Sequence, residues 1–226
     1  MTPVTIRLQR ASGYVRRVQF VLASQSPARL ALLRSAGLDP AVFVSGVDED
    51  AVAASLTDPS PSELVAALAA AKAEAVVDQV AAVHPDAVVV ACDSMLNIGG
   101  QMVGKPPNPD IARQRWAAMA GSSGELLTGH AVVRLDGGTR AKETSGWEST
   151  TVRFGTPSPE EIDAYVATGE PLHVAGGFTI DGLGSWFVEG LDGGHTSVIG
   201  ISLPLTRRLL AEVGVSVVDL WRRPAS

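Results

Sequence analysis

An aspartate inside an apolar run is the residue of this sequence whose surroundings most directly indicate chemistry. Asp93 lies between the apolar segments 88–91 and 95–96, so a strand there would bury its carboxylate. An unpaired buried carboxylate costs several kcal/mol and therefore needs a cation, a metal or a function. If the glycines at 99–100 form a two-residue hairpin turn, the returning chain brings Lys105 within reach of Asp93. A structural Asp93–Lys105 ion pair and a functional carboxylate both fit this pattern.

A second group of polar residues follows the predicted strand 18–23. Pro27 suits the first position of a helix and Ser26 its N-cap, and a helix N-terminus attracts anions. Ser24 and Ser26 add hydroxyl groups. The helix dipole disfavours the charge of Arg29 in the first turn by about 0.3–1 kcal/mol, and a bound phosphate would reverse that effect. An ordinary capped helix with a solvated arginine is the alternative.

Two further candidates rest on weaker patterns. Lys72 shares one helical face with Val65, Leu68 and Val76, so its ammonium either reaches back to solvent or enters a pocket. The acidic segment 48–50, which contains Glu49, follows a strand-like stretch. Clustered carboxylates bind hard cations but also occur in plain loops.

Other reactive residue types show no functional spacing. The four histidines, which include His130 and His173, have neither metal-ligand spacing nor a partner pattern. Cys92 alternates with Asp93 on the predicted strand and is expected to be a small core residue. Phosphate-binding Gly-Lys loops, Gly-x-Ser-x-Gly motifs and Cys-x-x-Cys pairs are missing from the sequence.

The elements that must position these residues alternate between strands and helices. This order predicts an α/β fold with a mixed sheet. We expect one domain over 18–222 and an N-terminal extension over 1–17. The expected strands are 18–23, 87–98, 101–106, 126–135, 147–154 and one before the turn at 192–194. The expected helices begin at Pro27, Pro61, Pro109 and Pro159 and after Pro204, and the second ends near Val80. The glycine-rich stretch 169–184 is expected to be an ordered loop.

Composition narrows the class of protein. The chain has 226 residues, a formal net charge of −6 and 46% hydrophobic residues. An acidic balance argues against nonspecific nucleic-acid binding, and no apolar run reaches the length of a membrane span. A single cysteine, Cys92, fits a reducing compartment. The expectation from composition is a soluble intracellular protein.

Taken together, several segments resemble the Maf family of nucleotide pyrophosphatases. They occur in the family's order and cover nearly all of the chain from about residue 18. The matching segments are LASQSPARLALLRSAG (22–37), VDED (47–50), LAAAKAEAV (68–76), VVVACDS (88–94), GKP (104–106), TGEP (168–171), AGGFTIDGLGSWFVEGLDG (175–193) and VIGISLP (198–204).

The resemblance implies a fold, an activity and a set of site residues. The fold is the elongated α/β architecture of inosine triphosphate pyrophosphatases, a mixed sheet flanked by helices with a deep cleft. The activity is hydrolysis of a nucleoside triphosphate to monophosphate and pyrophosphate with Mg²⁺ or Mn²⁺, in a cytoplasmic and often dimeric protein. A house-cleaning role toward non-canonical nucleotides fits it. By resemblance Asp93 is the general base, and Glu49 and Asp93 are the metal-site residues. The substrate-binding residues are then Ser24, Arg29, Lys72 and Lys105.

Four positions depart from the family pattern. Ala28 replaces the first of two arginines, and Val174, after His173, replaces a lysine. Ser94 stands where the thymidine and uridine triphosphate branch has threonine, and Asp181 where it has glutamine. A carboxylate repels phosphate and accepts hydrogen bonds from N–H donors, so we place Asp181 beside the nucleobase of the substrate. Arg29, Ser94 and Asp181 are the candidate specificity residues, and the preferred nucleotide stays open.

Two other function classes remain. A nucleotide-binding regulator of cell division or septum formation would need little or no catalysis, and the loss of cationic side chains at Ala28 and Val174 favours it. A nucleotidyltransferase would need a second substrate and would release no pyrophosphate with water as the only acceptor.

Overall fold

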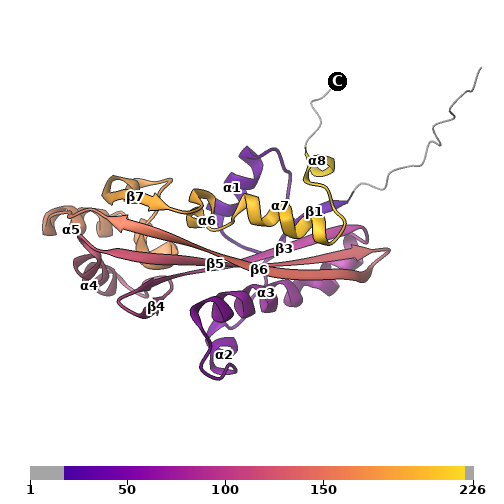
Figure 1. Ribbon diagram of the computed structural model, residues 1–226, viewed down its shortest axis with the longest axis horizontal. Helices are drawn as coiled ribbons and strands as arrows, with labels where there is room; N and C mark the ends of the chain where they lie inside the picture. The colour runs from indigo at the N-terminus through magenta and orange to yellow at the C-terminus, as the bar shows by residue number, and fades with distance from the viewer. Residues whose placement is uncertain (1–17, 222–226) are drawn as a thin grey trace, which may run out of the picture.

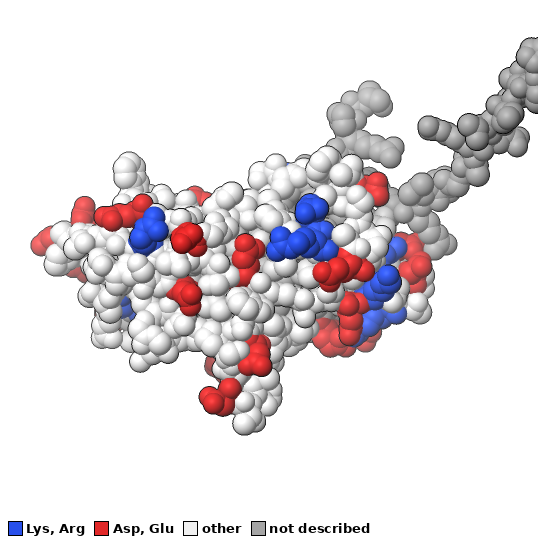
Figure 2. Space-filling model, viewed as in Figure 1, with Lys and Arg blue, Asp and Glu red and all other residues white. Residues whose placement is uncertain are grey.

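The computed structural model describes residues 18–221, and the other residues are drawn in grey in Figure 1 and Figure 2. The predicted N-terminal extension, residues 1–17, and the predicted domain end at residue 222 lie outside the described residues. The domain boundaries therefore stay predictions.

The centre of the molecule is one mixed seven-stranded sheet, as the sequence predicts. The strand order is β2-β1-β3-β5-β6-β7, with β4 paired to β3. The two β1 pairings, with β2 and β3, are parallel, and all the others are antiparallel. The strands are β1 (Gln19–Leu22), β2 (Ala41–Val42), β3 (Ala87–Ile98), β4 (Gln101–Val103), β5 (Ser123–Asp136), β6 (Thr139–Phe154) and β7 (Val188–Asp192).

Helices cover both faces of this sheet (Figure 1). Alternate residues of β1 and β3 point to opposite faces, as the strand pleat requires. Val21, Val89 and Ala91 pack against α3 (Pro61–Val83). Leu22, Val90 and Cys92 pack instead against α1 (Pro27–Ser35) and α7 (Leu203–Glu212). The sheet is therefore apolar on both faces, and a charge on β3 lies between helix layers.

A third core lies at the far end of the elongated molecule (Figure 1). Trp116 of α4 (Pro109–Met119) makes edge contacts there with Phe154 and with Tyr165 of α5 (Pro159–Ala167). The glycine-rich stretch is ordered, as expected, into three 3-10 helices: η1 (Glu170–His173), η2 (Ala175–Gly177) and η3 (Leu183–Phe187). Each of the three contributes a side chain that packs against the third core, Leu172, Ala175 and Phe187.

Most expected elements are confirmed, with five corrections. The strand expected at 147 begins at Thr139, because Gly137 and Gly138 alone make the turn. The helix from Pro61 continues to Val83, and the strand expected at 126 begins at Ser123. The return strand ends at Val103 instead of 106. Three short helices were not expected: α2 (Glu49–Ala54), α6 (His195–Ile199) and α8 (Val217–Leu220). Among residues 18–221, no helix combines the length and apolar character of a membrane span.

One stretch of β3 has a strand partner on one side only. On the β5 side the pairing runs without a break from Ala87 to Asn97. On the other side β1 pairs as far as Val90 and β4 begins pairing at Leu96. Along residues 91–95 no described strand pairs with this edge. A gap of this kind lets side chains from both faces of the sheet reach one opening.

Buried His130 ties β5 to the start of α7. Its Nδ1 lies 3.1 Å from the Thr128 carbonyl, and its Nε2 lies 2.9 Å from the backbone nitrogen of Ser202, the N-cap of α7. A carbonyl only accepts and a backbone N–H only donates, so the ring is neutral with its proton on Nδ1. Burial and, to a smaller extent, the nearby Arg29 charge lower the pKa of His130 to about 4, against the opposing effect of the bond to Thr128.

His130 makes stability depend on pH. The unfolded chain, with an ordinary histidine pKa of about 6.5, binds the proton first as pH falls, so stability is lost between about 6.5 and 4. We expect this group to remove about 2 kcal/mol of unfolding free energy between pH 7 and pH 5. His130→Gln keeps a donor and an acceptor but does not titrate. Urea unfolding at both pH values should show a smaller loss for this variant by that amount. Equal losses would contradict the assignment.

Candidate active site

A cleft of about 840 Å³ opens at the unpaired edge of β3. It is lined by every candidate residue named from the sequence: Ser24, Arg29, Glu49, Lys72, Asp93, Ser94, Lys105 and Asp181. Ala28, His173 and Val174, which bear on the departures from the family pattern, also line it. The deep cleft that the resemblance implies is therefore present, and segments far apart in the sequence contribute to it.

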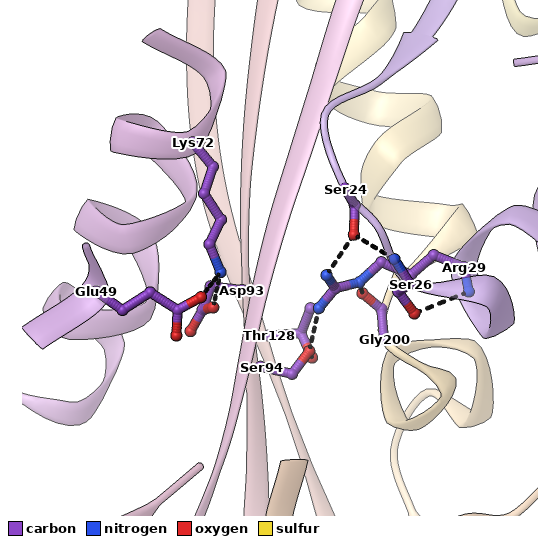
Figure 3. Close-up of polar contacts among 9 residues, drawn as sticks. All are labelled: Ser24, Ser26, Arg29, Glu49, Lys72, Asp93, Ser94, Thr128 and Gly200. Carbon is purple, nitrogen blue, oxygen red and sulfur yellow. Dashed lines mark hydrogen bonds and ion pairs between the residues drawn. The ribbon is translucent and has the colours of Figure 1, made fainter. Parts of the chain in front are cut away.

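Asp93 meets a lysine on the α3 face of the sheet (Figure 3). The Lys72 ammonium lies 2.5 Å from Asp93 Oδ1 and 2.6 Å from Glu49 Oε1. The Lys72 and Asp93 side chains are 12% and 7% exposed, whereas Glu49 is 57% exposed. One ammonium thus joins a buried carboxylate to one at the cleft mouth.

The structural alternative for Asp93, an ion pair with Lys105, is wrong, because Asp93 pairs with Lys72. Ile98 does pair with Gln101 across the two-glycine turn, but the β3–β4 ladder ends at Val103. Lys105 therefore lies beyond the ladder, exposed on the cleft wall, and forms no hydrogen bond or ion pair with any residue of 18–221. The partner of Asp93 comes instead from α3, where the apolar stripe of the helix directs Lys72 inward.

Burial controls the proton affinity of Asp93. Desolvation raises the pKa of its carboxyl above the ordinary value, and the Glu49 charge adds to this rise. The Lys72 ammonium and the Arg29 guanidinium act in the opposite direction. The net shift is upward, so the carboxylate is a stronger base than a solvated aspartate.

A missing side chain lets α3 approach Asp93. Gly129 of β5 lies opposite Asp93 in the ladder. A Cβ atom there would lie 2.1 Å from the Val65 carbonyl oxygen, so α3 could not keep its position. Lys72 lies two helical turns after Val65 on the same face. Gly129 therefore permits the contact between Lys72 and Asp93.

Arg29 joins three elements on the opposite face. Its Nε donates to the Gly200 carbonyl at 2.6 Å, Nη1 to Ser24 Oγ at 3.1 Å and Nη2 to Ser94 Oγ at 3.1 Å (Figure 3). Gly200 is the C-cap of α6. The guanidinium has five N–H donors, so one remains on each terminal nitrogen.

The hydroxyl protons behind Arg29 have a definite direction. Thr128 Oγ1 donates to the Ser197 carbonyl at 3.0 Å, so its single proton is used there. In the 3.0 Å contact between Ser94 and Thr128, Ser94 is therefore the donor. Ser94 accepts from Arg29 and donates to Thr128, which leaves it only acceptor capacity toward the cleft.

Ser24, unlike Ser94, keeps a hydroxyl proton that it can donate. Its Oγ accepts from the backbone N–H of Ser26 at 3.2 Å and from Arg29 at 3.1 Å. The described hydrogen bonds use only its lone pairs, so the Ser24 proton is available to a ligand. Ser26 caps α1 as predicted, and its Oγ accepts a hydrogen bond from the backbone N–H of Arg29 at 3.3 Å.

The sequence that forms this site matches a known family. A family model described as Maf-like protein matches residues 19–213. The chain belongs to the Maf family. Curated relatives carry the name nucleoside triphosphate pyrophosphatase. One from Saccharopolyspora erythraea is 68% identical over 92% of this chain and 100% of its own length. Others from Nocardia farcinica and Streptomyces coelicolor are 58% and 55% identical, each over 91% of this chain and 97% and 95% of their own lengths.

Three residues of this Maf site were not found from the sequence. Thr128 and Gly129 lie on β5, and Gly200 caps a helix that was not expected. The glycine inside the apolar run 126–135 was a usable signal, because such a glycine often marks a close backbone approach. The role of Thr128 depends on strand register and carried no such signal.

Gly129 provides a direct test of how this Maf chain packs α3. Gly129→Ala should lower the free energy of unfolding by about 1–3 kcal/mol, because the added methyl group overlaps the α3 backbone. Gly146→Ala is the matched control on β6, where a Cβ would make ordinary contacts of 3.4 Å or more with leucine side chains. Urea unfolding compares the two variants. Equal stability of both would show that α3 does not depend on Gly129.

Proposed function

We propose that this chain hydrolyses a nucleoside triphosphate to a nucleoside monophosphate and pyrophosphate, with Asp93 as general base. The observation that carries the proposal is the buried Asp93 carboxylate, paired with Lys72 in a cleft whose other groups suit a polyphosphate. The name of the curated relatives supports the same reaction.

The cleft supplies donors for phosphate oxygens. Arg29 keeps one N–H on each terminal nitrogen, a fork that suits an anionic oxygen pair. Lys72 donates a hydrogen bond to Asp93 and forms an ion pair with Glu49, and its ammonium has three N–H groups, so at least one remains for a ligand. Ser24 adds a hydroxyl proton, and Lys105 a charge at the wall. Stabilising negative charge in this way is the main requirement of phosphoryl transfer.

Asp93 would activate the attacking water. The water oxygen bonds to the α-phosphorus while one of its protons passes to the Asp93 carboxylate. The bridging P–O bond breaks, and its electron pair leaves with pyrophosphate. The raised pKa of Asp93 favours this proton transfer, and the Lys72 ammonium keeps the carboxylate ionised beforehand.

The residues present fit a divalent cation bound together with substrate. Glu49 and Asp93 converge on one positive group, the Lys72 ammonium, so both carboxylates already face a common point. Within residues 18–221 no group of three His, Cys, Asp or Glu side chains could hold a metal. Mg²⁺ commonly takes one or two carboxylates together with phosphate oxygens and water. When bound, Mg²⁺ or Mn²⁺ would offset phosphate charge.

The nucleobase of the substrate would be recognised by hydrogen-bond acceptors of the cleft. Ser94 offers only a lone pair toward the cleft, and Asp181 is an exposed carboxylate on its wall. Both would accept from N–H groups of a base edge, and Arg29 orients Ser94. Whether the substrate is canonical or a non-canonical nucleotide removed by house-cleaning is decided by a substrate panel. A homodimer and a cytoplasmic location also stay predictions from the resemblance.

The central prediction concerns Asp93→Asn. This variant should lose about 10²- to 10⁴-fold in kcat, because an amide does not take the water proton. Nucleotide affinity, measured by calorimetry, should change much less, because Arg29, Ser24 and Lys105 remain. The assay is pyrophosphate release with Mg²⁺ or Mn²⁺ across canonical, methylated and deaminated triphosphates.

The control makes the same chemical change outside the cleft. Asp163→Asn removes an exposed carboxylate that pairs with Arg113 and should keep wild-type turnover. Wild-type turnover in Asp93→Asn would refute the assignment of the base. Tight binding without any pyrophosphate release by the wild-type chain would favour the regulator, and release only with a second acceptor would favour a nucleotidyltransferase.

A further inference from the structure

A carboxylate outside the cleft holds one of its walls. Glu170 begins η1, and its Oε1 accepts hydrogen bonds from Tyr165 Oη at 2.8 Å, Thr179 Oγ1 at 2.6 Å and the Gly184 N–H at 3.0 Å. Its Oε2 accepts from the Leu183 N–H at 3.0 Å. All four partners are donors, so the group they surround must be an acceptor on both oxygens.

The segment held in this way carries Asp181. Thr179 and Asp181 line the cleft, whereas Glu170 does not. Bonds from Glu170 reach Thr179 on one side of Asp181 and Leu183 on the other. Asp181 is thus the centre of a short loop fixed at both ends by one side chain.

Two glycines let the loop wrap around the carboxylate. A Cβ at Gly182 would lie 2.6 Å from Glu170 Oε2, and one at Gly184 would lie 2.4 Å from the Tyr165 hydroxyl. The loop therefore contacts this acceptor so closely that no side chain fits between them. Although burial raises the pKa of Glu170, the bonds from Thr179, Gly184, Leu183 and Tyr165 lower it below its ordinary value overall.

We propose that Glu170 is a positioning residue for base discrimination: it fixes the loop 179–184 so that the Asp181 carboxylate meets the base edge. This inference rests on the proposed function of the cleft. It assigns to Glu170 no contact with substrate and no part in the phosphate chemistry, which lies with Asp93, Lys72 and Arg29.

The test is a comparison of Glu170→Gln with the wild-type chain on ribonucleoside triphosphates that differ only in the base. A carboxamide has one oxygen, and its NH₂ group would face donors, so the loop loses its fixed position. We expect the ratio of kcat/KM between the best and the poorest nucleotide to shrink about tenfold. The loss should appear in KM, with kcat for the best nucleotide nearly unchanged.

Two further sets of variants separate positioning from a general loss of stability. Glu161→Gln weakens the capping box of the neighbouring helix α5 and should leave the ratio unchanged. Tyr165→Phe and Thr179→Val each remove one donor to Glu170, so each should reduce the ratio, by less than Glu170→Gln does. These two variants also test the proposal if Glu170→Gln fails to fold. In an Asp181→Asn background, Glu170→Gln should have no further effect on the ratio.

Several outcomes would overturn the proposal. These are an unchanged ratio in Glu170→Gln with only a lower melting temperature, an equal loss in Glu161→Gln, or an undiminished effect in the Asp181→Asn background. If the wild-type chain releases no pyrophosphate from any nucleotide, the proposed function fails instead. The Kd values of the same nucleotides for the wild-type and Glu170→Gln chains then decide the role of Glu170 in the same way.

Discussion

The contact between the Lys72 ammonium and the buried Asp93 carboxylate is the interaction on which the rest of the site depends. A carboxylate on a strand covered by helices on both faces is costly to bury, and removing one partner of such a pair leaves an uncompensated charge. The ammonium also reaches Glu49, so the stabilising partner of Asp93 is itself connected to the cleft mouth. A contact that keeps the carboxylate ionised also keeps a cation beside the position where phosphate charge would lie.

A gap in strand pairing along one edge of β3 makes this contact possible. Neither β1 nor β4 pairs with residues 91–95 of β3, so the edge is open where Asp93 and Ser94 lie. Adjacent strand residues point to opposite faces, and each meets a cation there, Lys72 from α3 and Arg29 from α1. The open edge joins these two faces into one cleft.

The residue types and local patterns in the sequence were enough to predict β3, the capped helices and the candidate residues around the cleft. What they did not reveal was the register and the approach of one element to another. The hairpin rule brings Lys105 within reach of Asp93, but the ladder ends at Val103, and the partner of Asp93 comes from α3. Thr128 and the bonds of Glu170 depend on distant segments meeting, which no local pattern records. Asp181 was assigned to the base from charge alone, and its position in the cleft wall agrees with that hypothesis.

The most direct measurement of the central contact is a double-mutant cycle of unfolding free energy with Lys72→Met, Asp93→Asn and the double variant. Lys72→Met alone should destabilise the chain by about 3 kcal/mol, because it leaves a buried carboxylate without its partner. The double variant should be less destabilised than the sum of the single changes, with a coupling of about 2 kcal/mol or more. Additive effects would contradict the account, because they would mean that Asp93 and Lys72 do not stabilise each other.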